Sequence, residues 1–173
     1  MSAQHKSSRI KQLRLGKECT KRLNAASVQL NSSTLWILGG YNADRRTGST
    51  EFLRADSSVG IPGPKLPISM DRFCTVKYSD DQVYIIGGWT GTEALNKVYI
   101  YDPMDGFTRI EGPALKNKRR AHTCAVMSNG QQSKIVVAGG TQGFADFLSS
   151  VEIFDPTVNN WIPGKEIQFY FKK

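Results

Sequence analysis

The sequence contains few of the residues from which catalytic and metal centres are built. Its 173 residues include two histidines, His5 and His122, and three cysteines, none of them in a Cys-x-x-Cys pair. A zinc site needs several His, Cys or carboxylate ligands at close spacing, and no such spacing is present. The signature motifs of P-loop nucleotide-binding proteins and of serine hydrolases are also missing. We therefore expect no metal site, no cofactor and no catalytic residues.

Long apolar segments are missing too. No run of about 18 apolar residues occurs, so the sequence predicts no membrane-spanning helix. The first residues are polar and basic and lack the apolar stretch of a secretory signal. An odd number of cysteines gives no disulfide framework. We expect a cytoplasmic protein in which Cys74 and Cys124 are buried thiols.

Positive charge predominates but is unevenly distributed. The formal net charge is +8, of which +6 falls in residues 1–22, where seven Lys and Arg side chains accompany one Glu. A basic tail of this kind suits nucleic acid or an acidic membrane surface. A solvated terminus is the simpler interpretation, and we favour it. We therefore expect neither a nucleic acid nor a membrane as a partner.

What the sequence does contain is a three-fold repeat. Three apolar stretches, residues 35–40, 83–88 and 135–140, each end in a pair of glycines, and the pairs are 48 and 52 residues apart. The six glycines are Gly39, Gly40, Gly87, Gly88, Gly139 and Gly140. A period of about 50 residues, carried by a strand that stops at Gly-Gly, is typical of the blades of a β-propeller. Glycine suits such a strand end because it accepts a positive φ and the close approach of another backbone.

Further features recur at matching offsets. Asp102 and Asp155 each precede a proline, and an aromatic residue follows, Phe107 in one repeat and Trp161 in the other. We expect both aromatic residues to occupy equivalent, buried sites on outer strands. The first repeat is looser, because Asp56 has no proline after it and the aromatic residue is missing. Each glycine stretch is preceded by a short run that begins with an arginine. These three arginines are Arg22, Arg72 and Arg120.

This ordered set of features resembles the kelch repeat over residues 20–164. The resemblance implies an all-β fold, a partial kelch-type β-propeller of about three four-stranded antiparallel blades. We expect repeats at residues 20–70, 71–118 and 119–166, a basic N-terminal tail at 1–19 and a C-terminal tail at 167–173. Residues 9–16 resemble residues 107–112 in outline, so a second interpretation of the tail is a remnant outer strand of a preceding blade.

Three blades are too few for a closed ring, because propellers have roughly four to eight blades. Both ends of the stack then expose apolar faces, which favours association. The chain is interpreted in three ways: as a piece of a longer protein, as half of a ring completed by a second copy, or as a stack whose flanking segments cover its ends. We favour the first interpretation, and self-association through the open blade ends is the alternative.

In kelch proteins the loops around one face, and the residues leading into the inner strands, contact partner peptides. The resemblance therefore implies a non-enzymatic protein-interaction module. Arginines at matching lead-in positions suit an acidic protein or peptide, since a guanidinium grips a carboxylate with two hydrogen bonds. The alternative is that these arginines, and His122 and Trp89 with them, act in packing within the fold. The candidate partner-binding residues are Arg22, Arg72, Arg120, His122, Asn42 and Trp89. Of these, we expect Arg72 and Arg120 to lie on the same face.

Many kelch proteins combine the propeller with a BTB domain and deliver substrates to a cullin ubiquitin ligase. The resemblance thus further implies the substrate-recognition part of a ubiquitin ligase adaptor, although no BTB or F-box domain is visible in the sequence. The alternative function class is a carbohydrate-active enzyme of the galactose oxidase or sugar epimerase type. The oxidase builds its copper site from tyrosines and histidines, and the two histidines here do not favour it.

Overall fold

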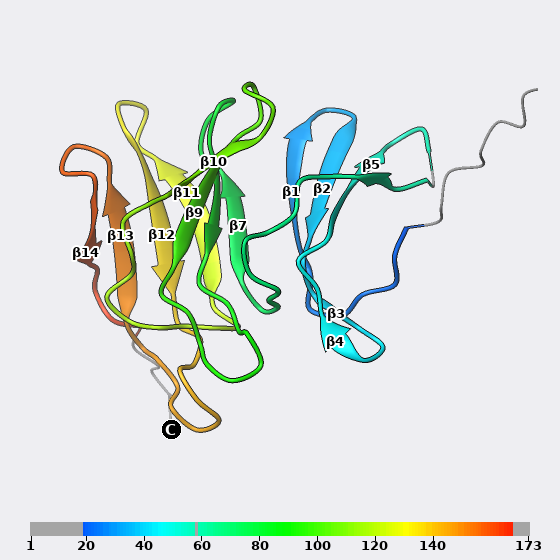
Figure 1. The fold of residues 1–173 in the computed structure, drawn as a ribbon. Coiled ribbons are helices and arrows are strands. Elements are labelled where there is room, and N and C mark those ends of the chain that lie inside the picture. The colour runs from blue at the N-terminus through cyan, green and yellow to red at the C-terminus, as the bar shows by residue number, and fades with distance from the viewer. Residues whose placement is uncertain (1–18, 58, 168–173) are drawn as a thin grey trace, which may run out of the picture.

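The structure, a computed structural model, describes residues 19–57 and 59–167 (Figure 1). It contains three four-stranded antiparallel sheets, which we call blades 1, 2 and 3 in chain order. The all-β fold of a partial propeller, predicted from the glycine repeats, is confirmed. No helix in these residues is long and apolar enough to cross a membrane. Residues 9–16, interpreted as a remnant strand, and residues 168–173 of the C-terminal tail lie outside the described residues.

The strands follow the repeat. Blade 1 consists of β1 (Ala26–Asn31), β2 (Thr34–Leu38), β5 (Thr50–Arg54) and β6 (Ile61–Pro62). Blade 2 consists of β7 (Cys74–Lys77), β8 (Val83–Ile86), β9 (Val98–Asp102) and β10 (Thr108–Glu111). Blade 3 consists of β11 (Thr123–Ser128), β12 (Ser133–Ala138), β13 (Val151–Asp155) and β14 (Asn160–Pro163). A small hairpin, β3 (Tyr41–Asn42) and β4 (Arg45–Arg46), lies between β2 and β5. The first strands of the blades, β1, β7 and β11, contact one another in that order.

Each blade has two faces, because side chains alternate along a strand. We call the face toward the next blade in the chain the forward face and the opposite face the rear face. The contact between blades 1 and 2 buries Trp36 and Leu38 against Val83, Ile85 and Tyr101. The contact between blades 2 and 3 buries these residues: Tyr84, Ile86, Val98, Ile100, Ile135, Val137, Phe154 and Trp161. Blade 2 is covered on both faces, which explains why its strand β8 is buried at every position from 83 to 86.

The glycine pairs end the second strand of a blade where the next blade comes closest. Gly39 and Gly87 have φ values of 57° and 62°. A Cβ on Gly39 would lie 2.7 Å from the carbonyl oxygen of Met70, and a Cβ on Gly87 would lie 2.6 Å from that of Arg119. The amide of the glycine that follows donates to the same carbonyl oxygen, at 2.9 Å in both cases. Both the left-handed backbone and the close approach therefore require glycine.

The aromatic residues after the Asp-Pro turns are only partly as predicted. Trp161 lies on β14 and is 2% exposed. Phe107 is half-buried and lies in the turn before β10, with a φ of 60°, and its ring centroid is 4.9 Å from that of Trp36. The prediction of an equivalent site on an outer strand is wrong for Phe107. The turn after Asp102 is one residue longer than the turn after Asp155, so the strand begins beyond Phe107.

The prediction of buried thiols at Cys74 and Cys124 is also wrong. The structure joins them in a disulfide, and both residues are half-buried. Cys74 lies on the forward side of β7 and Cys124 on the rear side of β11, with their Cα atoms 6.0 Å apart. This separation suits a disulfide. The sequence did not indicate the bond, because it depends on how the inner strands of two blades are placed when the blades pack.

We expect that reduction of this disulfide lowers the free energy of unfolding by about 2–4 kcal/mol. The bond joins residues 50 positions apart, and its loss returns conformational entropy to the unfolded chain. Denaturant unfolding with and without a phosphine reductant measures the effect. A Cys124→Ser variant should match the reduced protein, whereas Cys19→Ser, which leaves the bond intact, should respond to reductant as the unaltered chain does. Identical midpoints with and without reductant would contradict the prediction.

Candidate functional site

The loops that follow the three glycine pairs lie together at one end of the blades, at the bottom of Figure 1. They span residues 41–49, 89–97 and 141–150 and include the β3–β4 hairpin. The linkers between blades reach the same end, since backbone bridges join the linkers to the loops. We call this end of the molecule the loop face.

The bridges set the register between the lead-in residues and the loops. The residue after each glycine pair bridges to one lead-in residue: Leu23 with Tyr41, Asp71 with Trp89, and Arg120 with Thr141. Arg120 is therefore equivalent to Leu23 and Asp71, Arg22 comes one position earlier, and Arg72 one position later. The prediction that the three arginines occupy matching positions is wrong. The sequence pattern gives no exact register for the lead-ins, so it does not show which of two neighbouring residues matches a given residue of another repeat.

Arg22 makes its contacts inside blade 1. Its side chain is 4% exposed, and its Nη2 lies 3.0 Å from Oε1 of Glu51. Its Nη1 donates to two backbone carbonyl oxygens at 2.8 and 2.9 Å. Burial raises the pKa of Glu51, but hydrogen bonds from Thr20 and Cys19, together with the Arg22 charge, outweigh burial and lower that pKa to about 2. The pair is therefore ionised and shielded from solvent.

Arg119 makes the same arrangement in blade 3, although the repeat pattern did not single out this residue. Its side chain is fully buried, and Nη2 lies 2.8 Å from Oε1 of Glu152. The carboxylate of Glu152 also accepts hydrogen bonds from two backbone amides of the preceding linker. Blade 2 has Met70 and Tyr99 at the corresponding positions. The signal in the sequence was a Glu at the same place in the third strand of blades 1 and 3.

Arg120 lies between aromatic rings of two loops. Its guanidinium carbon is 4.1 Å from the ring centroid of Trp89 and 5.3 Å from that of Phe144. Its Nη2 donates to the carbonyl oxygen of Gly143 at 3.0 Å. Arg120 is 6% exposed and Trp89 is 8% exposed. Cation–π contacts strengthen as they lose water, so Arg120 holds the loops of blades 2 and 3 together.

Arg46 connects blades 1 and 2 in a similar way. This residue of β4 donates from Nε to Oδ1 of Asp71 at 3.0 Å. Its guanidinium carbon is also 5.7 Å from the ring centroid of Tyr41. The candidate Asn42 is half-buried and pairs with Arg45 across the β3–β4 hairpin. Arginines and aromatic residues thus alternate from loop to loop across the loop face.

Arg72 lies where the lead-ins of the three blades meet. Its backbone has a φ of 55°. Its amide donates to the carbonyl oxygen of Asn24 at 3.1 Å, and its carbonyl oxygen accepts from the amide of Ala121 at 2.8 Å. These hydrogen bonds fix its backbone at the centre of the loop face, and its side chain is half-buried.

His122 lies close to the second glycine pair. Its ring nitrogens are shielded from solvent, and the nearest side-chain atom to a Cβ built on Gly87 is its Cε1. Burial lowers the pKa of His122 to about 3, and the Arg119 charge acts in the same direction, so the imidazole is neutral. Within residues 19–57 and 59–167, no group of three or more His, Cys, Asp or Glu side chains is placed to hold a metal ion.

A basic groove of about 340 Å³ adjoins the β3–β4 hairpin on the loop face. Arg45, Arg46 and Lys65 line it, together with the hydroxyl groups of Thr47 and Ser69. No carboxylate lines this groove among the residues that the structure describes. No feature of the repeat indicated this groove, because it forms between a loop and a linker that carry separate parts of the repeat pattern.

Two phenylalanines project from the loop of blade 3. Phe144 is 90% exposed and Phe147 is 81% exposed. Exposed aromatic side chains of this size are typical of surfaces that contact another molecule. The only signal in the sequence was the presence of two phenylalanines in an otherwise polar loop.

Comparison with known proteins gives a family model and relatives that include a plant and a human protein. The family model of the kelch motif matches residues 72–106 and 119–166. An F-box/kelch-repeat protein of Arabidopsis thaliana is 27% identical over 140 residues, which make up 76% of this chain and 32% of the plant protein. Kelch-like protein 33 of Homo sapiens is 28% identical over 147 residues, which make up 83% of this chain and 26% of the human protein. The chain thus spans less than a third of the length of either relative.

Proposed function

Because this chain is a kelch-motif protein, we propose that it is a protein-binding module whose loop face receives an acidic segment of a partner protein. The observation that carries the proposal is the basic groove lined by Arg45, Arg46 and Lys65. Arg46 is paired with Asp71, so Arg45 and Lys65 supply the charge of the groove that favours an anionic ligand. Phe144 and Phe147, in the loop of blade 3, are exposed at the same end of the molecule and supply apolar contacts there.

The sequence-based candidates have different roles in this proposal. Arg72 has a half-buried side chain at the centre of the loop face and is a candidate contact for the partner. Arg120 and Trp89 are largely buried, so we propose that they act by shaping the loop that carries Phe144. Arg22 is paired with Glu51, which leaves its charge neutralised.

We expect the double substitution Arg45→Ala and Lys65→Ala to weaken binding of an acidic peptide by about 1–3 kcal/mol, since each charged hydrogen bond contributes on this scale when shielded. The probe is a fluorescein-labelled Glu-rich peptide, and the measurement is fluorescence anisotropy at two salt concentrations. Salt should weaken binding to the unaltered chain more than to the variant, because exposed charge contacts are screened.

The matched control removes the same charge elsewhere. Arg54→Ala with Arg109→Ala deletes two exposed arginines that lie outside the groove, and its affinity should equal that of the unaltered chain. Arg72→Ala should weaken binding without a change in melting temperature, whereas Arg120→Ala should lower both. If the groove variant and the control bind the peptide equally well, the loop face is not the acidic-segment site.

We propose further that the module recognises substrates within a longer ubiquitin ligase adaptor. The support is that the plant relative is an F-box/kelch-repeat protein and that this chain matches 32% of its length. Sequencing the complete transcript that encodes the chain tests this directly, because an F-box or BTB segment would have to be encoded with it. The carbohydrate-active alternative comes second, because nothing in the described residues favours it.

A further inference from the structure

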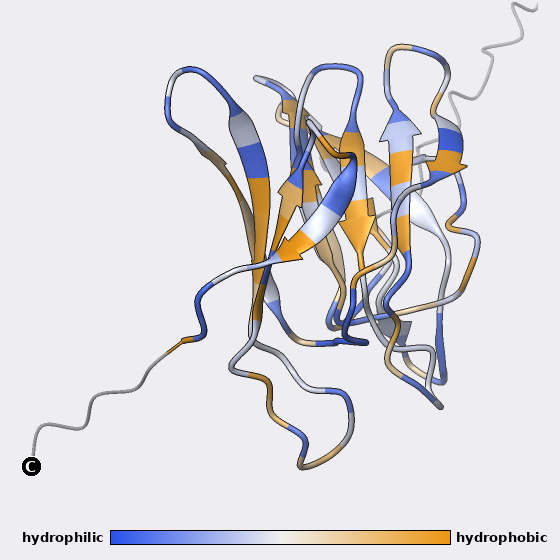
Figure 2. Ribbon diagram, turned by 90° about the vertical axis from the view of Figure 1, so that its left-hand side faces the viewer, coloured by the Kyte–Doolittle hydropathy of each residue, from blue (hydrophilic) through white to orange (hydrophobic). Residues whose placement is uncertain are grey.

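The forward face of blade 3 repeats a surface that the molecule buries elsewhere. The pairs Val136–Ile153 and Ala138–Val151 occupy the positions of the blade 2 pairs Tyr84–Ile100 and Ile86–Val98. In blade 2 all four residues are buried against blade 3. In blade 3 the four residues are half-exposed. Figure 2, which looks toward blade 3, shows hydrophobic stretches along its strands.

The rear face of blade 1 repeats the opposite surface. Leu35 and Leu53 pair across β2 and β5, in the positions of Ile135 and Phe154 in blade 3. Ile135 and Phe154 are buried against blade 2, whereas Leu35 and Leu53 are half-exposed. The two ends of the stack therefore present the two halves of an interface that the chain forms twice within itself.

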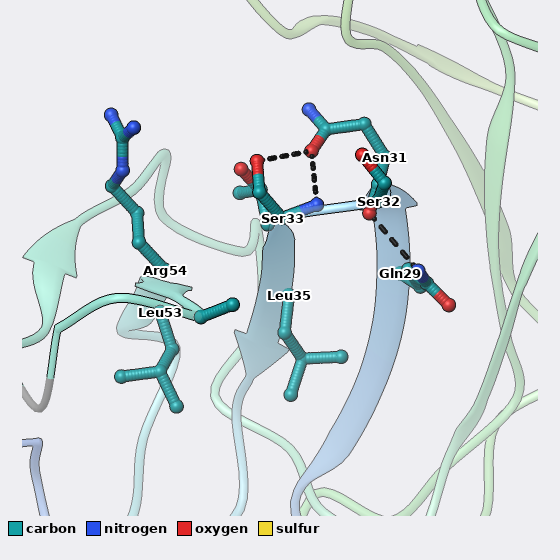
Figure 3. A pocket seen from close by; sticks show the side chains of 9 residues that line it. Gln29, Asn31, Ser32, Ser33, Leu35, Leu53 and Arg54 are labelled. Carbon is teal, nitrogen blue, oxygen red and sulfur yellow. Dashed lines mark hydrogen bonds between the residues drawn. The ribbon is translucent and has the colours of Figure 1, made fainter.

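The two end surfaces also carry a groove and an exposed side chain at corresponding places. The rear face of blade 1 has a groove of about 260 Å³ beside Leu35 and Leu53, near the turn that joins β1 and β2 (Figure 3). At the corresponding place between blades 2 and 3, Tyr78 of blade 2 packs on Phe154 and donates to the carbonyl oxygen of Ser133 at 2.8 Å. In blade 3 the position of Tyr78 is held by Met127, which is 61% exposed.

Met127 is the side chain at the position from which Tyr78 fills the corresponding place between blades 2 and 3. Leu53 is smaller than the aromatic residue at its position in blade 3, which leaves room beside it. An unbranched methionine side chain fills irregular apolar gaps of this kind well. Met127 is more exposed than Ile162, the large apolar residue on the opposite edge strand of the forward face, which is 38% exposed.

We propose that a second copy of this chain covers both end surfaces, with the forward face of blade 3 in each copy packed on the rear face of blade 1 in the other. Each copy then contributes three blades, and two identical contacts join them about a two-fold axis. A ring of about six blades lies within the range of closed propellers. A head-to-tail contact closes in this way only if its rotation is half a turn, and otherwise it produces open chains of copies.

The test is the molar mass in solution, measured by light scattering and analytical ultracentrifugation over a wide concentration range. We expect a species of twice the 19.2 kDa of one chain. Ile153→Asp places a charge on the forward face, and Leu35→Asp places one on the rear face. Each should raise the dimer dissociation constant by at least about tenfold, because an unpaired charge is costly at an apolar contact. Met104→Asp, which alters a 75%-exposed methionine in the turn between β9 and β10, is the control and should leave the constant unchanged.

Mixing the two face variants tests the proposal even if one of the variants is less stable than the unaltered chain. The Ile153→Asp copy retains an intact rear face, and the Leu35→Asp copy retains an intact forward face. One good contact therefore forms in the mixture, and it should associate more tightly than either variant alone. A chain that stays monomeric at every concentration overturns the proposal. The end surfaces would then be covered by terminal segments or by further blades. A dimer that only one of the face variants weakens, or a series of open oligomers, overturns it as well.

Discussion

Replacing Trp161 with alanine is expected to lower the free energy of unfolding by about 3–5 kcal/mol, the scale found when a buried aromatic side chain is truncated. Trp161 is 2% exposed, and its ring centroid lies 5.5 Å from that of Phe154. Its indole Nε1 donates to the carbonyl oxygen of Pro113 at 2.8 Å, which ties blade 3 to the linker from blade 2. The substitution removes packing, leaves a cavity and leaves that carbonyl group without its donor.

Urea unfolding followed by circular dichroism measures this effect. Trp161→Phe keeps most of the packing but lacks the hydrogen bond. It should therefore lower the free energy of unfolding less than the alanine variant does. Val158→Ala is the matched control, because Val158 lies in the neighbouring turn and is 62% exposed. An unchanged unfolding midpoint for Trp161→Ala would mean that this aromatic does not support the contact between blades 2 and 3.

Replacing Glu152 with alanine is expected to destabilise the protein by about 3–5 kcal/mol, because it leaves the buried guanidinium of Arg119 without its counter-charge. The side chains of the pair are 0% and 3% exposed, so little solvent reaches the remaining charge. Two linker amides also lose their acceptor. The cost should therefore exceed that of removing an exposed ion pair such as Lys118 with Glu93.

Blade 2 supplies the control for this second prediction. It has Met70 and Tyr99 where blade 3 has Arg119 and Glu152. Copying that pair with Arg119→Met and Glu152→Tyr removes both charges together, and apolar replacement of a buried ion pair is often close to neutral. The double variant should therefore unfold at a higher urea concentration than Glu152→Ala alone. If it is less stable than the single variant, the pair contributes through something other than mutual neutralisation.

The three-fold repeat predicted the strands and their order because each strand end is set by local chemistry, a glycine pair or an Asp-Pro turn. The register of the lead-ins was not predictable in the same way. Arg119 and Arg120 are adjacent, and only the bridge from Arg120 to Thr141 shows which of them corresponds to Arg22. A register error of one residue therefore confuses the arginine of the buried ion pair with the arginine that lies between two loops.

The disulfide and the basic groove illustrate a second limit. Cys74 and Cys124 are 50 residues apart, and Arg45 and Lys65 lie in a loop and a linker of different outline. The two cysteines come together only when blades 2 and 3 pack, and Arg45 and Lys65 only when the linker folds onto the loop, so the strand pattern of the repeat indicates neither pair. The prediction for Phe107 was wrong for a local reason: an added residue in the turn shifts this aromatic residue off the strand, although its ring still packs on the rear side of its blade, against Trp36.

The hydrogen bonds from Gly40 to Met70 and from Gly88 to Arg119 have a consequence for the dynamics of the stack. In each bond the amide belongs to one blade and the acceptor belongs to the lead-in of the next blade. The bond therefore breaks when those two blades separate, even if every strand within them stays paired. Deuterium uptake at these two amides therefore measures the opening of a whole blade against its neighbour. Amides within β8 and β12 instead exchange only when the strands of a sheet separate. A difference between the exchange rates of these two groups of amides therefore distinguishes the separation of whole blades from the unfolding of a single blade.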